Sequence, residues 1–152
     1  MTLIDKAKSF LGGHGVTVRH VSIEGAEPAA ARLALPDGGI KGVFAVSAEK
    51  PCEVRGRRTQ LVMELSHADG RLEQVVLGGD EARPPVVYPY ELAAGFTVED
   101  TFDIVFDGSI EAILALRRLS AGDGVRLFLR TVVDVAGSPF DPEAVDEVAL
   151  AT

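Results

Sequence analysis

The segment from Val125 to Asp134 alternates between two kinds of side chain, and this alternation constrains the fold more than any other feature. One set of alternate positions holds only Val, Leu and Thr, whereas the other set also carries Arg126 and Arg130. Successive side chains of a β-strand point to opposite faces of the sheet, so the pattern predicts a strand with one buried face. Val and Thr are stiff at χ1, which favours strands further.

Similar period-two patterns predict further strands along the chain. They cover residues 16–23, 31–35, 40–46, 58–66, 71–77, 86–91 and 101–106, and a last apolar segment follows Asp141-Pro142. Asp69-Gly70 joins two of these strands, and Asp-Gly is typical of a type I′ hairpin turn, which needs positive φ at both positions. Several short strands separated by turns predict an antiparallel sandwich or barrel, and we expect an immunoglobulin-like β-sandwich.

Two segments show the 3.6-residue period of helices. Residues 2–11 place Leu3, Ala7, Phe10 and Leu11 on one side, and the following Gly12-Gly13 is expected to end this helix. Residues 109–119 are expected to form a short helix inserted between strands. No repeat or linker divides the 152 residues, so the whole of 1–152 is expected to form a single domain.

The charge and the cysteine content narrow the classes of function. The formal net charge is -8, which disfavours nucleic acid as a partner because its phosphates would be repelled. Cys52 is the only cysteine, so no internal disulfide is expected. The chain has neither an apolar run of about 20 residues nor a secretory pattern over Met1–Leu11, so we expect no membrane span and a cytoplasmic location.

The residue types that carry catalysis or bind metals are present but scattered. The histidines His14, His20 and His67 have no ligand spacing with Cys52, and no nucleophile elbow occurs. The glycines at 12–15 follow a helix rather than a strand, which is the wrong order for a phosphate loop. We therefore expect no enzyme, cofactor or metal site. The arginines at 55, 57 and 58 and most of the acidic residues are interpreted as solvated.

The order of these features resembles the bacterial sporulation-control protein family, whose members have an arrestin-like fold. The chain looks like the amino-terminal lobe of that family, although Val105 stands where the family usually has proline. The residues that carry the resemblance are Gly12–Gly15, Val16–Ile23, Gly39–Val46, Arg58–Leu65, Asp100–Phe106, Leu127–Val135, Asp141-Pro142 and Asp146. The resemblance implies a regulatory or scaffolding role.

We therefore expect a non-catalytic adaptor that binds a protein partner at sheet edges and loops, and a homodimer through edge strands is one such contact. The candidate contact residues are Val86, Tyr88, Tyr90, Asp141, Asp146 and Val148. The alternative is a sandwich that binds a small ligand or a cation. Its site would lie at the corner formed by Asp134, Asp141 and Asp146.

Overall fold

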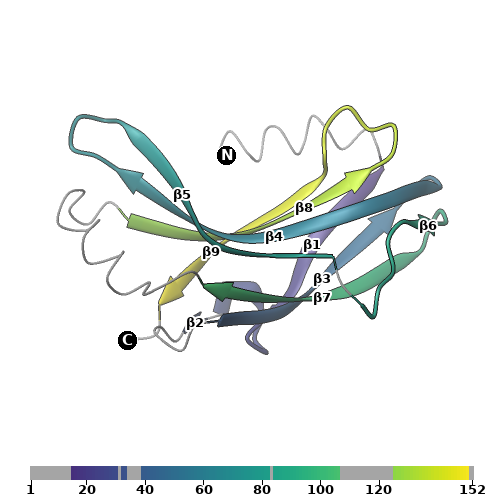
Figure 1. Cartoon of the computed structure of the whole chain (residues 1–152), viewed down its shortest axis with the longest axis horizontal. Coiled ribbons are helices and arrows are strands. Elements are labelled where there is room, and N and C mark those ends of the chain that lie inside the picture. Colours follow the sequence, from purple (N-terminus) through teal and green to yellow (C-terminus); the bar gives the residue numbers. More distant parts are fainter. Residues whose placement is uncertain (1–14, 31, 34–38, 83, 107–124, 151–152) are drawn as a thin grey trace.

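The computed structural model describes residues 15–30, 32–33, 39–82, 84–106 and 125–150 (Figure 1). This part of the chain is mainly β, as predicted. Its strands are β1 (Val16–Ile23), β2 (Arg32–Leu33), β3 (Gly39–Ala48), β4 (Cys52–Ser66), β5 (Leu72–Glu81), β6 (Tyr90–Leu92), β7 (Thr97–Phe106), β8 (Val125–Val135) and β9 (Glu143–Leu150). A 3-10 turn, η2 (Pro28–Ala30), follows β1. The two predicted helices, 2–11 and 109–119, lie outside the described residues.

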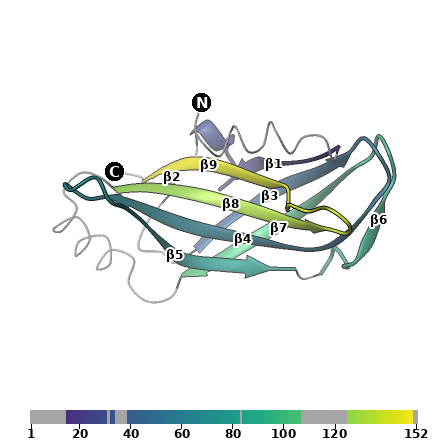
Figure 2. The same cartoon turned by 90° about the horizontal axis from the view of Figure 1, so that it is seen from above.

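Hydrogen bonds join the strands into one sheet in the order β1-β3-β7-β5-β4-β8-β9-β2, and β6 pairs with β4 outside this path. The sheet folds over on itself, so that β1, β3 and β7 lie behind β4, β5, β8 and β9 (Figure 2). The predicted sandwich of two separate sheets is therefore not confirmed. The two layers remain connected because Gly78 and Gly79 of β5 pair with Phe106 and Val105 of β7.

Two places around this folded sheet have little or no backbone pairing. We call the contact of β5 with β7 the β5–β7 junction; its ladder has only the two residue pairs above. We call the contact of β1 with β9 the β1–β9 seam, where the strands lie beside each other and the described residues form no ladder. Side chains must therefore hold the two layers together at both places.

The core lies between the two layers and is built from the inward positions of each strand. Burying one large aliphatic or aromatic side chain contributes roughly 1.5–3 kcal/mol, so these residues supply most of the driving force for folding. The largest fully buried side chains are Phe44, Phe102, Ile23, Ile40, Leu61, Met63, Leu65, Ile104, Leu129, Val46 and Val54. The alternation predicted for β1, β4 and β8 is confirmed by their burial.

A glycine in β3 makes room for one of these aromatic rings. A Cβ added to Gly42 would lie 2.3 Å from Cζ of Phe102 and 2.3 Å from the carbonyl oxygen of Ser22. Real Cβ atoms do not approach other atoms so closely. Glycine is therefore required here because a ring lies across the strand, as is typical of glycine inside a sheet.

The structure corrects two local predictions. The hairpin between β4 and β5 is present, but only Gly70 has positive φ (86°), so the predicted type I′ turn is wrong. Instead, the Gly70 amide donates to the His67 carbonyl and the His67 amide donates to the Arg71 carbonyl, as in a type I turn followed by a glycine bulge. The strand predicted at 86–91 is also largely wrong, because β6 begins only at Tyr90.

Candidate binding site on the outer face

The solvent side of β4, β5, β8 and β9, which we call the outer face, carries a row of apolar side chains. Val76 of β5 is in register with Val62 of β4, and Val62 is in register with Phe128 of β8. Residues in register on neighbouring antiparallel strands point to the same face and pack against each other. The row continues diagonally to Val145 of β9, which pairs with Arg130. An apolar row on a solvent-facing sheet surface indicates a contact site.

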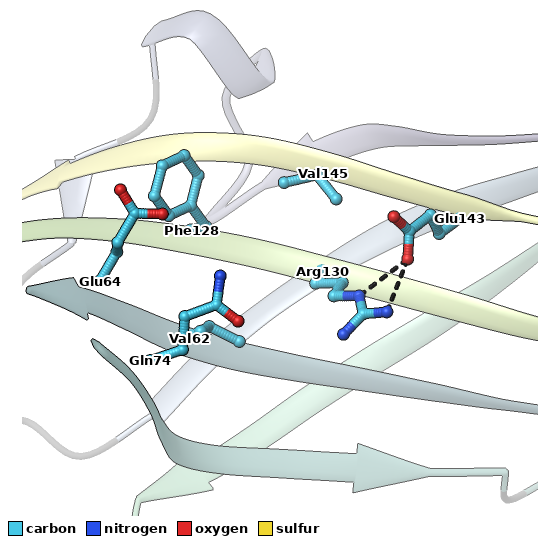
Figure 3. A pocket seen from close by; sticks show the side chains of 7 residues that line it. All are labelled: Val62, Glu64, Gln74, Phe128, Arg130, Glu143 and Val145. Atoms are coloured by element: carbon cyan, nitrogen blue, oxygen red, sulfur yellow. Dashed lines mark hydrogen bonds and ion pairs between the residues drawn. The ribbon is translucent and has the colours of Figure 1, made fainter. Parts of the chain in front are cut away.

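This row contains a hollow of about 230 Å³ (Figure 3). Its lining residues are Val62, Glu64, Gln74, Phe128, Arg130, Glu143 and Val145. Val62 is 7% exposed and, together with Phe128 and Val145, lines the apolar part of the hollow. Glu64 and the paired Arg130 and Glu143 are the charged groups of its lining (Figure 3).

Two arginine–glutamate pairs connect β8 with β9 across this face. Arg130 contacts one carboxylate oxygen of Glu143 through both Nε and Nη2, each at 2.8 Å. Arg126 donates to both oxygens of Glu147, at 3.1 and 2.8 Å, and these hydrogen bonds lower the pKa of the Glu147 carboxyl. The Arg126 guanidinium also lies 5.0 Å from the centre of the Phe128 ring. The guanidinium therefore lies against the phenyl ring while it pairs with Glu147.

Apolar side chains are also exposed beside the hollow. Leu72 is 65% exposed and Val76 is 54% exposed, and both belong to β5. The β4–β5 hairpin extends away from the rest of the sheet (Figure 1). A partner could thus reach the apolar row and the hairpin together.

The β1–β9 seam is bridged by a buried polar cluster, which we call the His20 cluster. His20 Nδ1 lies 2.7 Å from Asp146 Oδ2, and His20 Nε2 lies 2.8 Å from Thr131 Oγ1. Thr131 Oγ1 in turn lies 2.9 Å from Thr59 Oγ1. The His20 side chain is 0% exposed, whereas that of Asp146 is 38% exposed. The cluster therefore runs from solvent into the core.

An aspartate, a histidine and a hydroxyl in a row also occur in nucleophilic catalysis, where the hydroxyl must meet a substrate. Here Thr131 and Thr59 are both 0% exposed. Their hydroxyls instead satisfy the imidazole and each other, as buried polar groups must. The His20 cluster therefore stabilises the seam rather than presenting a nucleophile.

A second buried cluster, the Arg57 cluster, lies at the β5–β7 junction. Arg57 Nη1 donates to Asp80 Oδ2 at 3.0 Å, and Nη2 donates to the Thr101 carbonyl at 2.7 Å. Its Nε lies 3.3 Å from Asp100 Oδ2, which is an ion-pair distance without hydrogen-bond geometry. The side chains of Arg57, Asp80 and Asp100 are 0%, 10% and 2% exposed. The amide of Asp103 also donates to Asp80 Oδ2.

Two tyrosines extend this cluster and have different hydroxyl environments. Tyr88 donates to Asp100 Oδ2 at 2.7 Å, and burial together with this carboxylate raises the pKa of Tyr88 well above its ordinary value. Burial and then the charge of Asp100 raise the pKa of Tyr90 from 10.0 to about 12. The Tyr90 hydroxyl is buried and has no hydrogen-bond partner among the described residues.

The predicted contact residues are dispersed over the fold. Val86 is partly exposed and precedes β6, Tyr88 and Tyr90 pack on the core, and Asp141 is exposed in the β8–β9 turn. Asp146 is taken by His20. Val148 is 5% exposed in the core, so its predicted place at an accessible edge is wrong. Its side chain points inward because Val148 is in register with the buried Leu127.

The three aspartates of the predicted cation corner do not all point to solvent. Asp134 and Asp141 are exposed, whereas Asp146 turns inward to His20. In the described ranges, no group of three or more His, Cys, Asp or Glu side chains is placed to hold a metal ion. The same ranges contain no helix that is long and apolar enough to cross a bilayer.

The sequence interpretation missed both clusters. It treated the arginines at 55–58 as solvated, yet Arg57 is the most enclosed charge described here, and it expected His20 to carry no particular role. The two-residue alternation of inward side chains could have predicted that both residues are buried. Arg57 lies two residues before the inward Thr59, and His20 lies two residues after the inward Val18. His20 lies within the predicted strand 16–23 and Arg57 one residue before the predicted strand 58–66, so the same alternation places both side chains inside.

Neither a scan against known protein families nor a search of curated proteins found a match to the sequence. Among solved structures, the chain is similar to the sporulation control protein Spo0M from Bacillus subtilis, with a TM-score of 0.62 at 15% sequence identity. That match covers 91% of this chain and 50% of Spo0M, so the chain spans about half the length of that protein.

Two further matches are weaker. The alkylpurine DNA glycosylase AlkC from Pseudomonas fluorescens matches with a TM-score of 0.38 at 13% identity, over 95% of this chain and 33% of that one. CsgH from R. palustris matches with a TM-score of 0.31 at 10% identity, over 87% and 91%. Only the match to Spo0M supports a likeness of fold, and it shows a β-rich fold like that of about half of that protein.

Proposed function

We propose that this chain is a non-catalytic regulatory module that binds a partner protein on its outer face. We also propose that it is a lobe of the arrestin-like kind found in the sporulation-control family. The likeness of its fold to that of Spo0M supports both proposals. The observation that carries the binding role is the hollow between Val62, Phe128 and Val145, with the Arg130–Glu143 pair and Glu64 at its rim.

The size of the hollow favours a protein partner over a small ligand. Small-molecule pockets in proteins usually measure about 300–1,000 Å³. The hollow measures about 230 Å³ and opens on a sheet surface, which suits one side chain inserted by a partner. Apolar anchors that fill such pockets supply most of the binding energy at protein interfaces.

The outer face is a better candidate than the edges expected from the sequence. Val148 is buried, and Tyr88 and Asp146 already hold partners in the two clusters, so a partner protein would have to compete with these contacts. By contrast, Leu72 and Val76 are already in solvent. A partner on the outer face would cover these apolar side chains at no cost to the core.

Site-specific photocrosslinking in the native host tests this proposal with the full chain. A photoreactive residue at Leu72 is expected to capture a partner, and Val76→Lys is expected to abolish that capture because it places a charge in the apolar row. The matched control is Thr17→Lys, an equally solvent-facing change on β1. Because Val76 and Thr17 are exposed, both variants should keep the melting temperature of the parent protein.

Capture that survives Val76→Lys, or that is lost equally with Thr17→Lys, would contradict docking on the outer face. In the same experiment, a photoreactive residue at Thr17 is expected to give no specific product. A product at Thr17 that persists when Leu72 gives none would move the interface to the other layer.

A further inference from the structure

The hollow on the outer face is preformed, and its shape limits what can enter it. Val62 and Val145 are β-branched and have few rotamers. Phe128 lies against the Arg126 guanidinium, which donates to both oxygens of Glu147. An apolar side chain that enters therefore contacts two walls with few rotamers, which limits the conformational entropy lost on the protein side.

The charges around the hollow are not balanced. Its lining has two carboxylates, Glu64 and Glu143, and one guanidinium, Arg130, which gives a local net charge of -1. Arg130 is matched by Glu143 at 2.8 Å. Among the described residues Glu64 forms no direct ion pair, and the Arg126 opposite it on β8 is bound to Glu147. The hydrogen bond to Glu147 and, less strongly, the charge of Glu64 raise the pKa of Arg126, so Glu64 shares this guanidinium only at longer range. Glu64 is thus the carboxylate of the lining without a direct ion pair among the described residues.

We infer that the residue recognised by this site is an apolar side chain with a lysine or arginine beside it in the partner protein. The apolar side chain fills the space between Val62, Phe128 and Val145, and the cation contacts Glu64 at the rim. The net charge of -8 over the whole chain attracts the same kind of segment from a distance. This inference rests on the proposed docking function and specifies the chemistry of its partner.

Four short peptides separate the two parts of this recognition. The probes are acetyl-Lys-Leu-Lys amide, acetyl-Gln-Leu-Gln amide, acetyl-Glu-Leu-Glu amide and acetyl-Lys-Gly-Lys amide, titrated into the full chain while NMR follows the methyl groups of Val62 and Val145. The lysine–leucine peptide is expected to bind about threefold more tightly than the glutamine–leucine peptide, the range of an exposed ion pair. Of the three leucine peptides, the glutamate peptide should bind most weakly, and the glycine peptide should leave the Val62 methyl groups unshifted.

The variant Glu64→Gln is expected to make the lysine and glutamine peptides bind equally. Its matched control is Glu99→Gln, an exposed change on β7 in the other layer, which should leave the threefold preference intact. Equal binding of the lysine and glutamate peptides, or a preference that survives Glu64→Gln, would overturn the inference. So would the absence of any shift at Val62 with all four peptides.

Two other occupants of the face would also overturn it, and each has its own readout. If a second copy covers the face, the peptide-free protein should sediment as a dimer that Val76→Lys dissociates. If residues 2–11 of the same chain cover it, Phe10→Ser should tighten binding of all three leucine peptides. Failure of the peptides with retained crosslinking at Leu72 would reject only the partner chemistry, whereas loss of that crosslinking would reject the docking function itself.

Discussion

The His20 cluster and the Arg57 cluster each join two strands that have little or no backbone pairing, at opposite sides of the folded sheet. They do so with different chemistry. The β1–β9 seam is closed by one imidazole, two hydroxyls and a carboxylate that is 38% exposed. The β5–β7 junction is closed by a guanidinium and two carboxylates that are all at least nine-tenths enclosed. Water can therefore compensate for lost contacts at the first cluster but much less at the second.

This comparison shows that the cost of disrupting a polar cluster depends on what remains buried afterwards. A charge left unpaired inside a protein costs far more than its hydrogen bonds contributed to stability. A polar group that can turn to solvent recovers part of its hydration. The following predictions test that difference, beginning with the largest expected effect.

Replacement of Arg57 by leucine should cause the greatest loss of stability. Asp80 and Asp100 would lose their shared guanidinium while staying buried, so we expect unfolding to become easier by about 3–5 kcal/mol. Urea denaturation followed by circular dichroism would measure this. The neighbouring Arg58→Leu is the control, because Arg58 is exposed and a surface change is expected to cost within about 0.5 kcal/mol. Similar losses for both variants would show that the Arg57 cluster is not a stabilising junction.

Replacement of His20 by alanine should cost less, about 2–3 kcal/mol, since it removes two hydrogen bonds and leaves a cavity but no fully buried charge. A double-mutant cycle with Asp146→Ala should show coupling between the two residues. Strictly additive effects would mean that the 2.7 Å contact contributes nothing to closing the seam.

Alkaline pH should destabilise the protein through the tyrosines of the Arg57 cluster. A folded-state pKa raised above the unfolded value favours the protonated form, so this stability is fully present below pH 10 and is lost as pH rises towards about 12 for Tyr90. After allowance for partial exposure we expect about 1–2 kcal/mol. Tyr88 and Tyr90 are the chain's only tyrosines and there is no Trp, so tyrosinate absorbance reports them directly. Titration of either hydroxyl near pH 10 in the folded protein would contradict their burial.

The two tyrosine-to-phenylalanine variants should have different effects on stability. Tyr88→Phe removes a hydroxyl that donates to Asp100, so we expect a loss of about 1 kcal/mol. Tyr90→Phe removes a buried hydroxyl without a described partner, so it should be neutral or slightly stabilising. Thermal melting of both variants measures the contrast. A larger loss for Tyr90→Phe would indicate that its hydroxyl has a partner after all.

The sequence predicted the local structure well where one strand's own pattern decides it. The alternation of β1, β4 and β8 and the hairpin at Gly70 needed no knowledge of distant residues. The clusters could be only half predicted. Alternation places His20 and Arg57 on inward positions, but their partners depend on how strands far apart in the chain meet. His20 and Asp146 are separated by 126 positions, and nothing within either strand specifies that contact.

The binding site was unpredictable for a related reason. Val62, Phe128 and Val145 each look like an ordinary apolar residue on the polar side of a strand. They become a hollow only because the registers of β4 with β8 and of β8 with β9 bring them together. The same registers pair Arg130 with Glu143, which leaves Glu64 as the charge of the lining without a direct ion pair in the described part of the chain. Strand register is set by the whole core, so it could not be read from any one segment.

Three consecutive residues of β9 serve both sides of the sheet. Val145 and Glu147 belong to the outer face, while Asp146 between them holds His20 on the inside. A molecule bound on the outer face therefore contacts the same short segment of β9 whose Asp146 holds His20 of β1. Amide protons of β1 should then exchange more slowly with heavy water when a molecule is bound on the outer face, although that molecule does not contact β1.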